Sequence, residues 1–118
     1  MNEGGSDPAS VARAARMTQN EALFREVNEQ ITALNELGAK MESFTVVCEC
    51  GNERCAAVVD VHRSHYEAAR AQGDRFLVAT GHGLPEIETV VEQHGDFVVV
   101  DKNDGIPEAI AAATDPRA

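Results

Sequence analysis

Hydrophobic positions recur at helical spacing in one N-terminal segment of the chain. Thr18 and Glu21 have the spacing of a capping box, which predicts a helix start, and Gly38 is a typical stop signal. Between them, apolar residues follow one another at intervals that place them on one side of a helix. These residues are Leu23, Phe24, Val27, Ile31, Leu34 and Leu37. The pattern predicts an amphipathic helix over residues 19–37.

Two interpretations of this helix are open from its sequence. Part of the stripe follows a heptad, which is compatible with a coiled-coil seam between two copies of the chain. The heptad core positions are Met17, Phe24 and Ile31, and then Val27 and Leu34. The wider stripe fits packing onto a sheet equally well. We expect the helix to cover its own domain, with a homodimer through Gln19–Leu37 as the alternative.

After residue 40 the chain alternates between β-branched apolar runs and turn residues, which predicts strands. The expected strands are residues 44–48, 55–61, 75–80, 87–92 and 97–102. Ser64 and Glu67 repeat the capping-box spacing and predict a short helix that ends before Gly73. The order of helix, hairpin, short helix, strand and hairpin predicts a small α+β domain with a mainly antiparallel sheet.

All three cysteines of the chain, Cys48, Cys50 and Cys55, lie within eight residues. Side chains two apart on a strand point to the same face, so Cys48 and Cys50 present their sulfurs together. The turn residues 51–54 then return the chain to Cys55. Zinc prefers four ligands in a tetrahedron, drawn from thiolates and imidazoles. The segment therefore predicts three ligands of a metal site that holds the domain together.

Four histidines could supply the fourth ligand, and His82 is the first choice. It follows a strand, and the flanking Gly81 and Gly83 carry no Cβ atoms, so this loop can approach a second loop closely. His62 is the second choice, although it lies near the far end of the strand that follows Cys55. His65 and His94 are expected in solvent.

Other chemistry for the cysteines stays open. The main alternative to structural zinc is a thiol-based redox sensor or enzyme that uses Cys48 and Cys50. An iron–sulfur cluster, a disulfide between Cys50 and Cys55, and three unligated thiols are further alternatives. A zinc site with four protein ligands has no open position for water, so we expect no catalysis by the metal.

Several of these segments resemble a group of small uncharacterised bacterial proteins familiar from actinobacteria. The similar segments are residues 44–55, 64–67, 75–78 with Gly81-His82, 90–92 and 97–100. Proteins of this group pair a CxCGxxxC segment with a later Gly-His loop and a Val-rich hairpin. The resemblance favours His82 as the fourth ligand and implies no activity.

Composition and charge narrow the classes of function. The 118 residues include 10 basic and 20 acidic side chains, for a formal charge of −10. This balance argues against binding to nucleic acid or to an anionic membrane, because both require clustered Lys and Arg. No apolar run is long enough to span a bilayer and no secretory signal opens the chain, so we expect a cytoplasmic protein.

The expected organisation is a single zinc-binding α+β domain over residues 18–102. Residues 1–17 are expected to be disordered or weakly helical, and residues 103–118 to form a flexible tail with at most one helical turn. The sequence thus predicts a small non-enzymatic zinc protein, whose structural metal site supports a protein–protein interaction or a regulatory module. The protein partner is not identified by the sequence.

Overall fold

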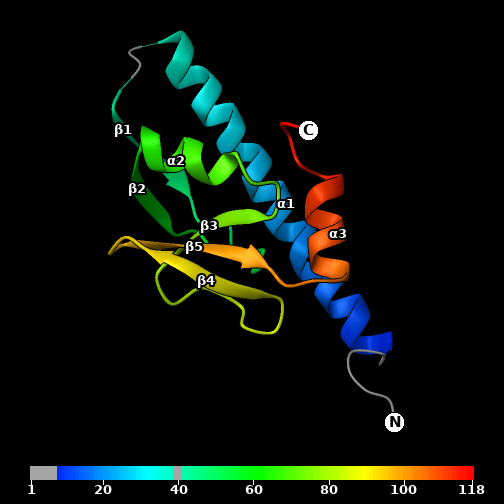
Figure 1. The fold of residues 1–118 in the computed structure, drawn as a ribbon. Coiled ribbons are helices and arrows are strands. Elements are labelled where there is room, and N and C mark those ends of the chain that lie inside the picture. The colour runs from blue at the N-terminus through cyan, green and yellow to red at the C-terminus, as the bar shows by residue number, and fades with distance from the viewer. Residues whose placement is uncertain (1–7, 39–40) are drawn as a thin grey trace.

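The computed structural model describes residues 8–38 and 41–118. Three helices and five strands lie in this part of the chain (Figure 1). They are α1 (Pro8–Leu37), β1 (Ser43–Val47), β2 (Val58–His62), α2 (Arg63–Arg70), β3 (Arg75–Ala79), β4 (Glu88–Gln93), β5 (Phe97–Lys102) and α3 (Ile106–Ala113). The predicted α+β class is confirmed. Residues 1–7, part of the predicted disordered segment, lie outside the described residues.

The strands form two antiparallel sheets. β1 and β2 make a hairpin in which Val47 lies opposite Val58 at the closed end. The second sheet has the order β3–β5–β4, so β3 pairs with β5 and not with its neighbour in sequence. β4 and β5 form the second predicted hairpin, with a register shift between Val90 and Glu92. The sequence predicted both hairpins but not the division into two sheets.

Strand β5 is buried on both faces, which explains its unbroken apolar run. One face contributes Phe97 and Val99 to a core shared with β1, β2 and α2. The other face contributes Val98 and Val100 to a second core. The remaining members of the second core are Phe76, Val78, Ala111, Cys48 and Cys50. Two of the three cysteines therefore belong to the hydrophobic interior.

Helix α1 begins at Pro8, well before the predicted start. Proline is common in the first turn of a helix, because its missing N–H would have no partner there. Thr18 lies inside the helix, where it is fully buried and its hydroxyl donates to the carbonyl of Ala14 at 2.9 Å. The predicted capping box of Thr18 and Glu21 is therefore wrong.

The side of α1 that faces the rest of the protein is mainly polar. Its buried residues are Met17, Thr18, Glu21, Ala22, Arg25, Asn28 and Thr32. Arg25, for example, donates to the carbonyls of Gly73 and Ala111 at 2.7 and 2.9 Å. The predicted apolar stripe lies largely on the opposite side, where Leu23 and Leu34 are 61% and 69% exposed. The expectation that this stripe covers the domain is wrong.

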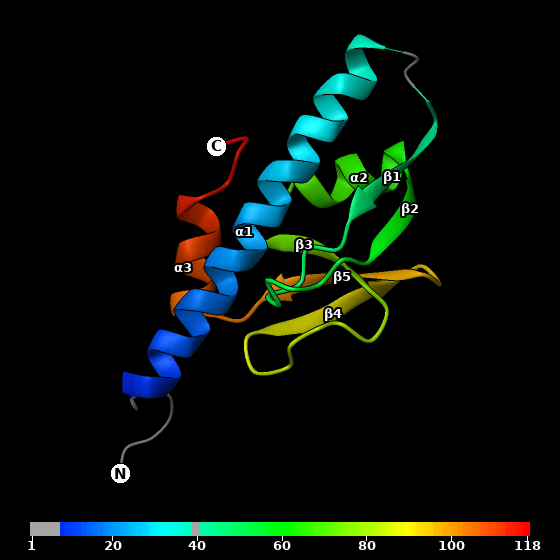
Figure 2. The ribbon, with the colours of Figure 1, turned by 180° about the vertical axis from the view of Figure 1, so that it is seen from behind.

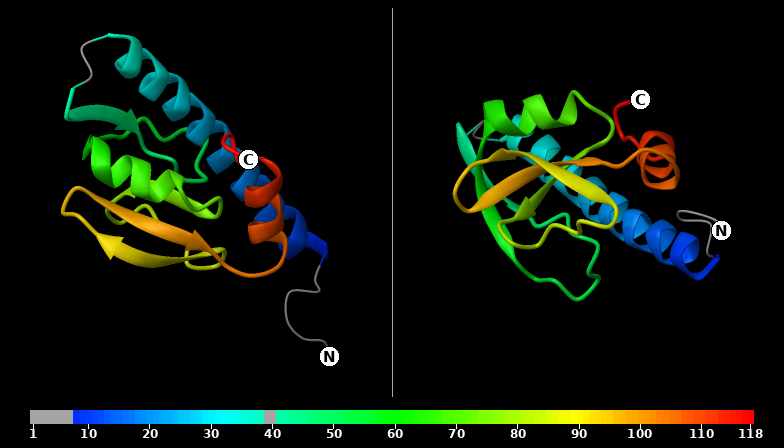
Figure 3. Two further views of the ribbon diagram at one scale, coloured as in Figure 1. Left: turned by 45° about the horizontal axis from the view of Figure 1, so that its top comes forward. Right: turned by 60° about the horizontal axis from the view of Figure 1, so that its bottom comes forward.

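Both short helices differ from their predictions. The N-cap of α2 is His62, whose Nδ1 accepts from the backbone N–H of Ser64 at 3.1 Å, so Ser64 does not cap the helix. The segment expected to be a flexible tail contains α3, which packs beside the N-terminal half of α1 (Figures 2 and 3). Beyond α3, Arg117 pairs with Glu29 and Glu67. The C-terminal segment is thus tied to α1 and α2.

Within residues 8–38 and 41–118, no helix combines the length and the apolar character needed to cross a bilayer.

Candidate metal centre

The segment from Cys48 to Cys50 leaves β1 and continues beside β3, an edge strand of the second sheet. Its extended backbone puts Cys48 and Cys50 on one side, where both are almost completely buried, and Glu49 on the other. The backbone N–H groups of Cys48 and Glu49 donate to the carbonyls of Ala57 and Leu77 at 3.0 and 2.9 Å. The backbone that carries the two sulfurs is therefore fixed by hydrogen bonds to the segment before β2 and to β3.

Glu49 holds this segment from the interior. Its carboxylate is fully buried and pairs with Arg70 of α2 at 2.8 Å. It also accepts from the backbone N–H of Leu77 at 2.9 Å and from the amide of Asn28 at 2.6 Å. Sequence reasoning missed this buried carboxylate. Only its position between two cysteines distinguished it.

The loop from Cys50 to Cys55 makes close contact with its surroundings at Gly51. A Cβ atom on Gly51 would lie 2.8 Å from a methyl group of Leu84 and 3.1 Å from the carbonyl oxygen of Met17. Asn20 of α1 also donates to the carbonyl of Gly51 at 3.1 Å. The loop can therefore pass between α1 and the histidine loop only because residue 51 has no side chain.

His82 comes from the loop that follows β3. Gly81 has φ +88°, a conformation that glycine adopts without strain, and the N–H of His82 donates to the carbonyl of Ala79 at 2.9 Å. A Cβ atom on Gly81 would meet nothing within 4 Å, and one on Gly83 would make only ordinary contacts. Gly81 thus provides a turn, and the close approach expected at these glycines occurs at Gly51.

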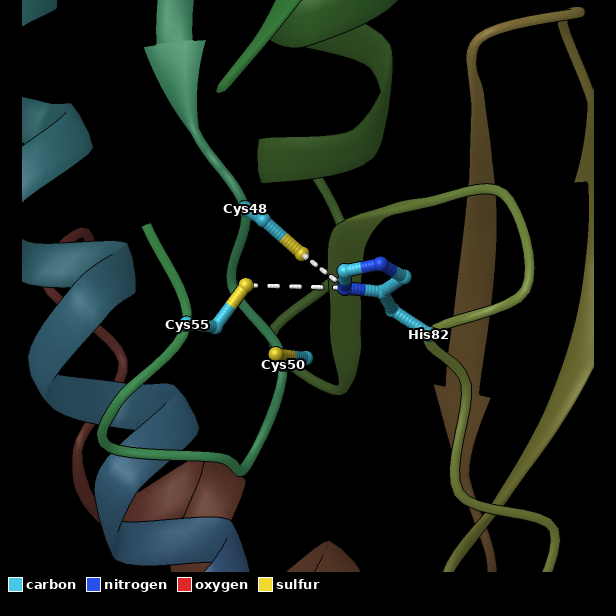
Figure 4. Close-up of side chains that lie close together, drawn as sticks. All are labelled: Cys48, Cys50, Cys55 and His82. Atoms are coloured by element: carbon cyan, nitrogen blue, oxygen red, sulfur yellow. Dashed lines mark hydrogen bonds between the residues drawn. The ribbon is translucent and has the colours of Figure 1, made fainter. Parts of the chain in front are cut away.

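The structure brings Cys48, Cys50, Cys55 and His82 together (Figure 4). Their ligand atoms all lie within 4.8 Å of one another. The Nδ1 atom of His82 is 3.7 Å from the sulfur of Cys48 and 3.5 Å from that of Cys55. A tetrahedral zinc ion with Zn–S of about 2.3 Å and Zn–N of about 2.0 Å separates sulfur from nitrogen by about 3.5 Å. The group therefore fits a metal ion of this size.

The surroundings of the sulfurs disfavour a free, reactive thiolate. Burial raises the pKa of Cys48 to about 12 and also raises the pKa of Cys50. Reactive cysteines have a lowered pKa, so this environment disfavours redox chemistry at the two positions. The sulfur of Cys48 accepts the backbone N–H of Ala79 at 3.1 Å. Such donors stabilise metal-bound thiolates.

The other histidines lie away from the cysteines. His62 caps α2, and its Nε2 lies 3.4 Å from Glu42. The rings of His65 and His94 are 4.4 Å apart, and His94 also stacks on Phe97. Among the four histidines, only His82 joins the cysteine group. All three cysteines are free thiols in the structure, so the disulfide alternative has no support from it.

No protein-family model, curated protein sequence or solved structure matches this chain. The resemblance to small actinobacterial proteins stays a prediction, and the function is argued from the site.

Proposed function

We propose that this chain is a non-enzymatic zinc-binding protein, in which Cys48, Cys50, Cys55 and His82 hold one structural Zn²⁺. The observation that carries the proposal is the convergence of three sulfurs and one imidazole nitrogen within 4.8 Å. Three cysteines and one histidine are a common donor set of structural zinc sites. A single ion also suits this spacing better than an iron–sulfur cluster, whose several metal atoms hold their ligands farther apart.

Four protein ligands leave no coordination position for water or substrate, so the metal has a structural role. Three thiolates and a neutral imidazole around Zn²⁺ carry a net charge of about −1, which weakens the metal as a Lewis acid. Structural zinc contributes roughly 10–16 kcal/mol in small domains. Here it would join the loop between β1 and β2 to the loop after β3.

The loop that carries His82 also shapes the surface beside the site. On one side, residues 81–84 line a hollow of about 300 Å³ with Cys50 and Asn52. On the other side, Gly81, Gly83 and Leu84 line a larger, mostly apolar hollow of about 590 Å³ over β4 and β5. A metal that fixes this loop fixes both hollows, which supports a role in presenting a protein-binding surface. The charge of −10 suits a basic partner surface.

The test is metal content and thermal unfolding of the purified protein with two matched variants. The expected result is one zinc per chain, and a strong chelator should abolish cooperative unfolding. His82→Ala should lower zinc affinity at least about tenfold, whereas His65→Ala, at an exposed histidine outside the group, should bind zinc like the wild type. An unchanged melting curve with metal confirmed absent would overturn the proposal.

Alkylation of the thiols separates this proposal from redox chemistry. Metal-bound cysteines should react slowly until chelator is added. The redox alternative instead requires at least one thiol that reacts faster than a free cysteine in the protein as isolated. Fast alkylation without chelator would favour that alternative.

A further inference from the structure

Helix α1 carries an apolar stripe that no described residue covers. Its large side chains Leu23, Val27, Leu34 and Leu37 are 61%, 38%, 69% and 85% exposed. At 100° per residue these four positions and Gln30 lie within about 80° of one another on the helix surface. The stripe lies opposite the buried side of α1, and Figure 2 views the molecule from the side on which α1 lies.

The helix cannot rotate to bury this stripe against its own domain. The buried side contains ionic and polar groups with fixed partners in the interior. Glu21 pairs with Lys102, and Asn28 donates to the carbonyl of Val47 and accepts from its N–H, both at 2.8 Å. Rotation would break these contacts and leave Lys102 buried without one of its carboxylate partners, which is costly. The apolar side of α1 is therefore available only to another molecule.

We propose that this stripe binds a second copy of the chain, with the two α1 helices antiparallel. With a two-fold axis between residues 28 and 29, Leu23 of one copy faces Leu34 of the other, and Val27 faces Gln30. Leu37 then faces Asn20. Leu23 and Leu34 of each stripe thus pack against those of the other copy, and the seam from residue 20 to 37 is about 27 Å long.

The charges near this stripe support a second copy and the antiparallel direction. Although the chain carries −10, the charged residues of α1 that lie on the stripe or within about 20° of its edges are only Arg16 and Glu26. Both are exposed and their charges cancel, so self-association is not opposed there. In a parallel pair, Arg16 of one chain would lie beside Arg16 of the other, and Glu26 beside Glu26, so like charges would repel. An antiparallel pair places Arg16 beyond the C-terminal end of the other α1, far from the second Arg16, so this repulsion is absent.

The four apolar residues of the stripe contribute no atom to the cysteine group, but Arg16 and Asn20 at the N-terminal end of the seam line a hollow with Gly51 and Asn52 of the cysteine loop, so the dimer is tested with metal bound. Sedimentation equilibrium of the metal-loaded protein over a wide concentration range is the test. The wild type should dimerise. Leu34→Glu should weaken the dimer at least about a hundredfold, since each dimer loses two buried leucines. Ile106→Glu, which adds the same charge at another exposed apolar residue, should leave it unchanged.

The direction of the helices is tested by removing one charge. Arg16→Gln should leave an antiparallel dimer unchanged within about twofold, because Arg16 lies beyond the end of the other α1. In a parallel dimer the same change removes a repulsion and strengthens association, which would overturn the antiparallel arrangement. A protein that is monomeric at all concentrations, or a dimer insensitive to Leu34→Glu, would overturn the inference as a whole.

Discussion

Substitution of Glu49 by glutamine tests how the interior of the protein positions the cysteines. Every group around its carboxylate is a donor: Arg70, the amide of Asn28 and the backbone N–H of Leu77. A glutamine side chain offers one acceptor oxygen and turns a donor toward one of these groups. It also leaves Arg70, which is 3% exposed, without its counter-ion.

The expected cost follows from this burial. Breaking a buried ion pair by removing one partner costs about 3–5 kcal/mol, a large part of the roughly 5–15 kcal/mol that stabilises a typical domain. Because Glu49 lies between Cys48 and Cys50, its loss should also displace both sulfurs. Changes to groups that orient metal ligands lower affinity about 10- to 100-fold, and we expect an effect in this range for zinc.

The assay combines thermal unfolding at saturating zinc with a zinc affinity from competition with a chromogenic chelator. Arg13→Ala serves as the control, because it removes an exposed ion pair with Glu86 and should change neither quantity. The double variant Glu49→Leu with Arg70→Met should be more stable than Glu49→Gln, since it leaves no uncompensated charge. If Glu49→Gln unfolds and binds zinc like the wild type, Glu49 does not position the site.

Two further substitutions test contacts around the histidine loop. Gly51→Ala should lower the free energy of unfolding by about 1–3 kcal/mol and weaken zinc binding, because the added Cβ meets the backbone of Met17 at 3.1 Å. The control Gly83→Ala adds a Cβ that meets only atoms at 3.8 Å and beyond, so this variant should unfold like the wild type. Burial raises the pKa of Glu88 from 4.5 to about 7, so the stability it contributes is present below pH 4.5 and lost as the pH rises through 7. Chemical unfolding of the zinc-loaded protein should therefore show the wild type losing stability relative to Glu88→Gln between about pH 4.5 and pH 7, and a constant difference would contradict this.

The strands and the grouping of the three cysteines with His82 were predictable because their signals are local. Alternating β-branched residues and turn residues placed all five strands to within a few residues of their observed bounds. Cys48 and Cys50 share a face because any extended chain has that property. His82 was the first choice among four histidines for a reason that was only partly right, since Gly81 provides a positive φ and not a close approach.

The orientation of α1 could not be predicted because it depends on partners that are distant in sequence. An apolar stripe normally faces the interior, and here that rule fails. The polar side is buried because Lys102 and the carbonyls of Gly73 and Ala111 offer it ionic and hydrogen-bonding partners. Nothing in the local pattern around residues 18–32 reveals these partners. The buried role of Glu49 was missed for the same reason.

X-ray absorption spectroscopy at the zinc edge of the purified protein tests the central claim most directly. The account predicts one zinc per chain with three sulfur ligands at about 2.3 Å and one nitrogen ligand at about 2.0 Å. The sulfur count should fall to two in Cys55→Ser. A metal bound only by oxygen and nitrogen, iron–iron scattering at the iron edge, or a purified protein without metal that folds normally would contradict it.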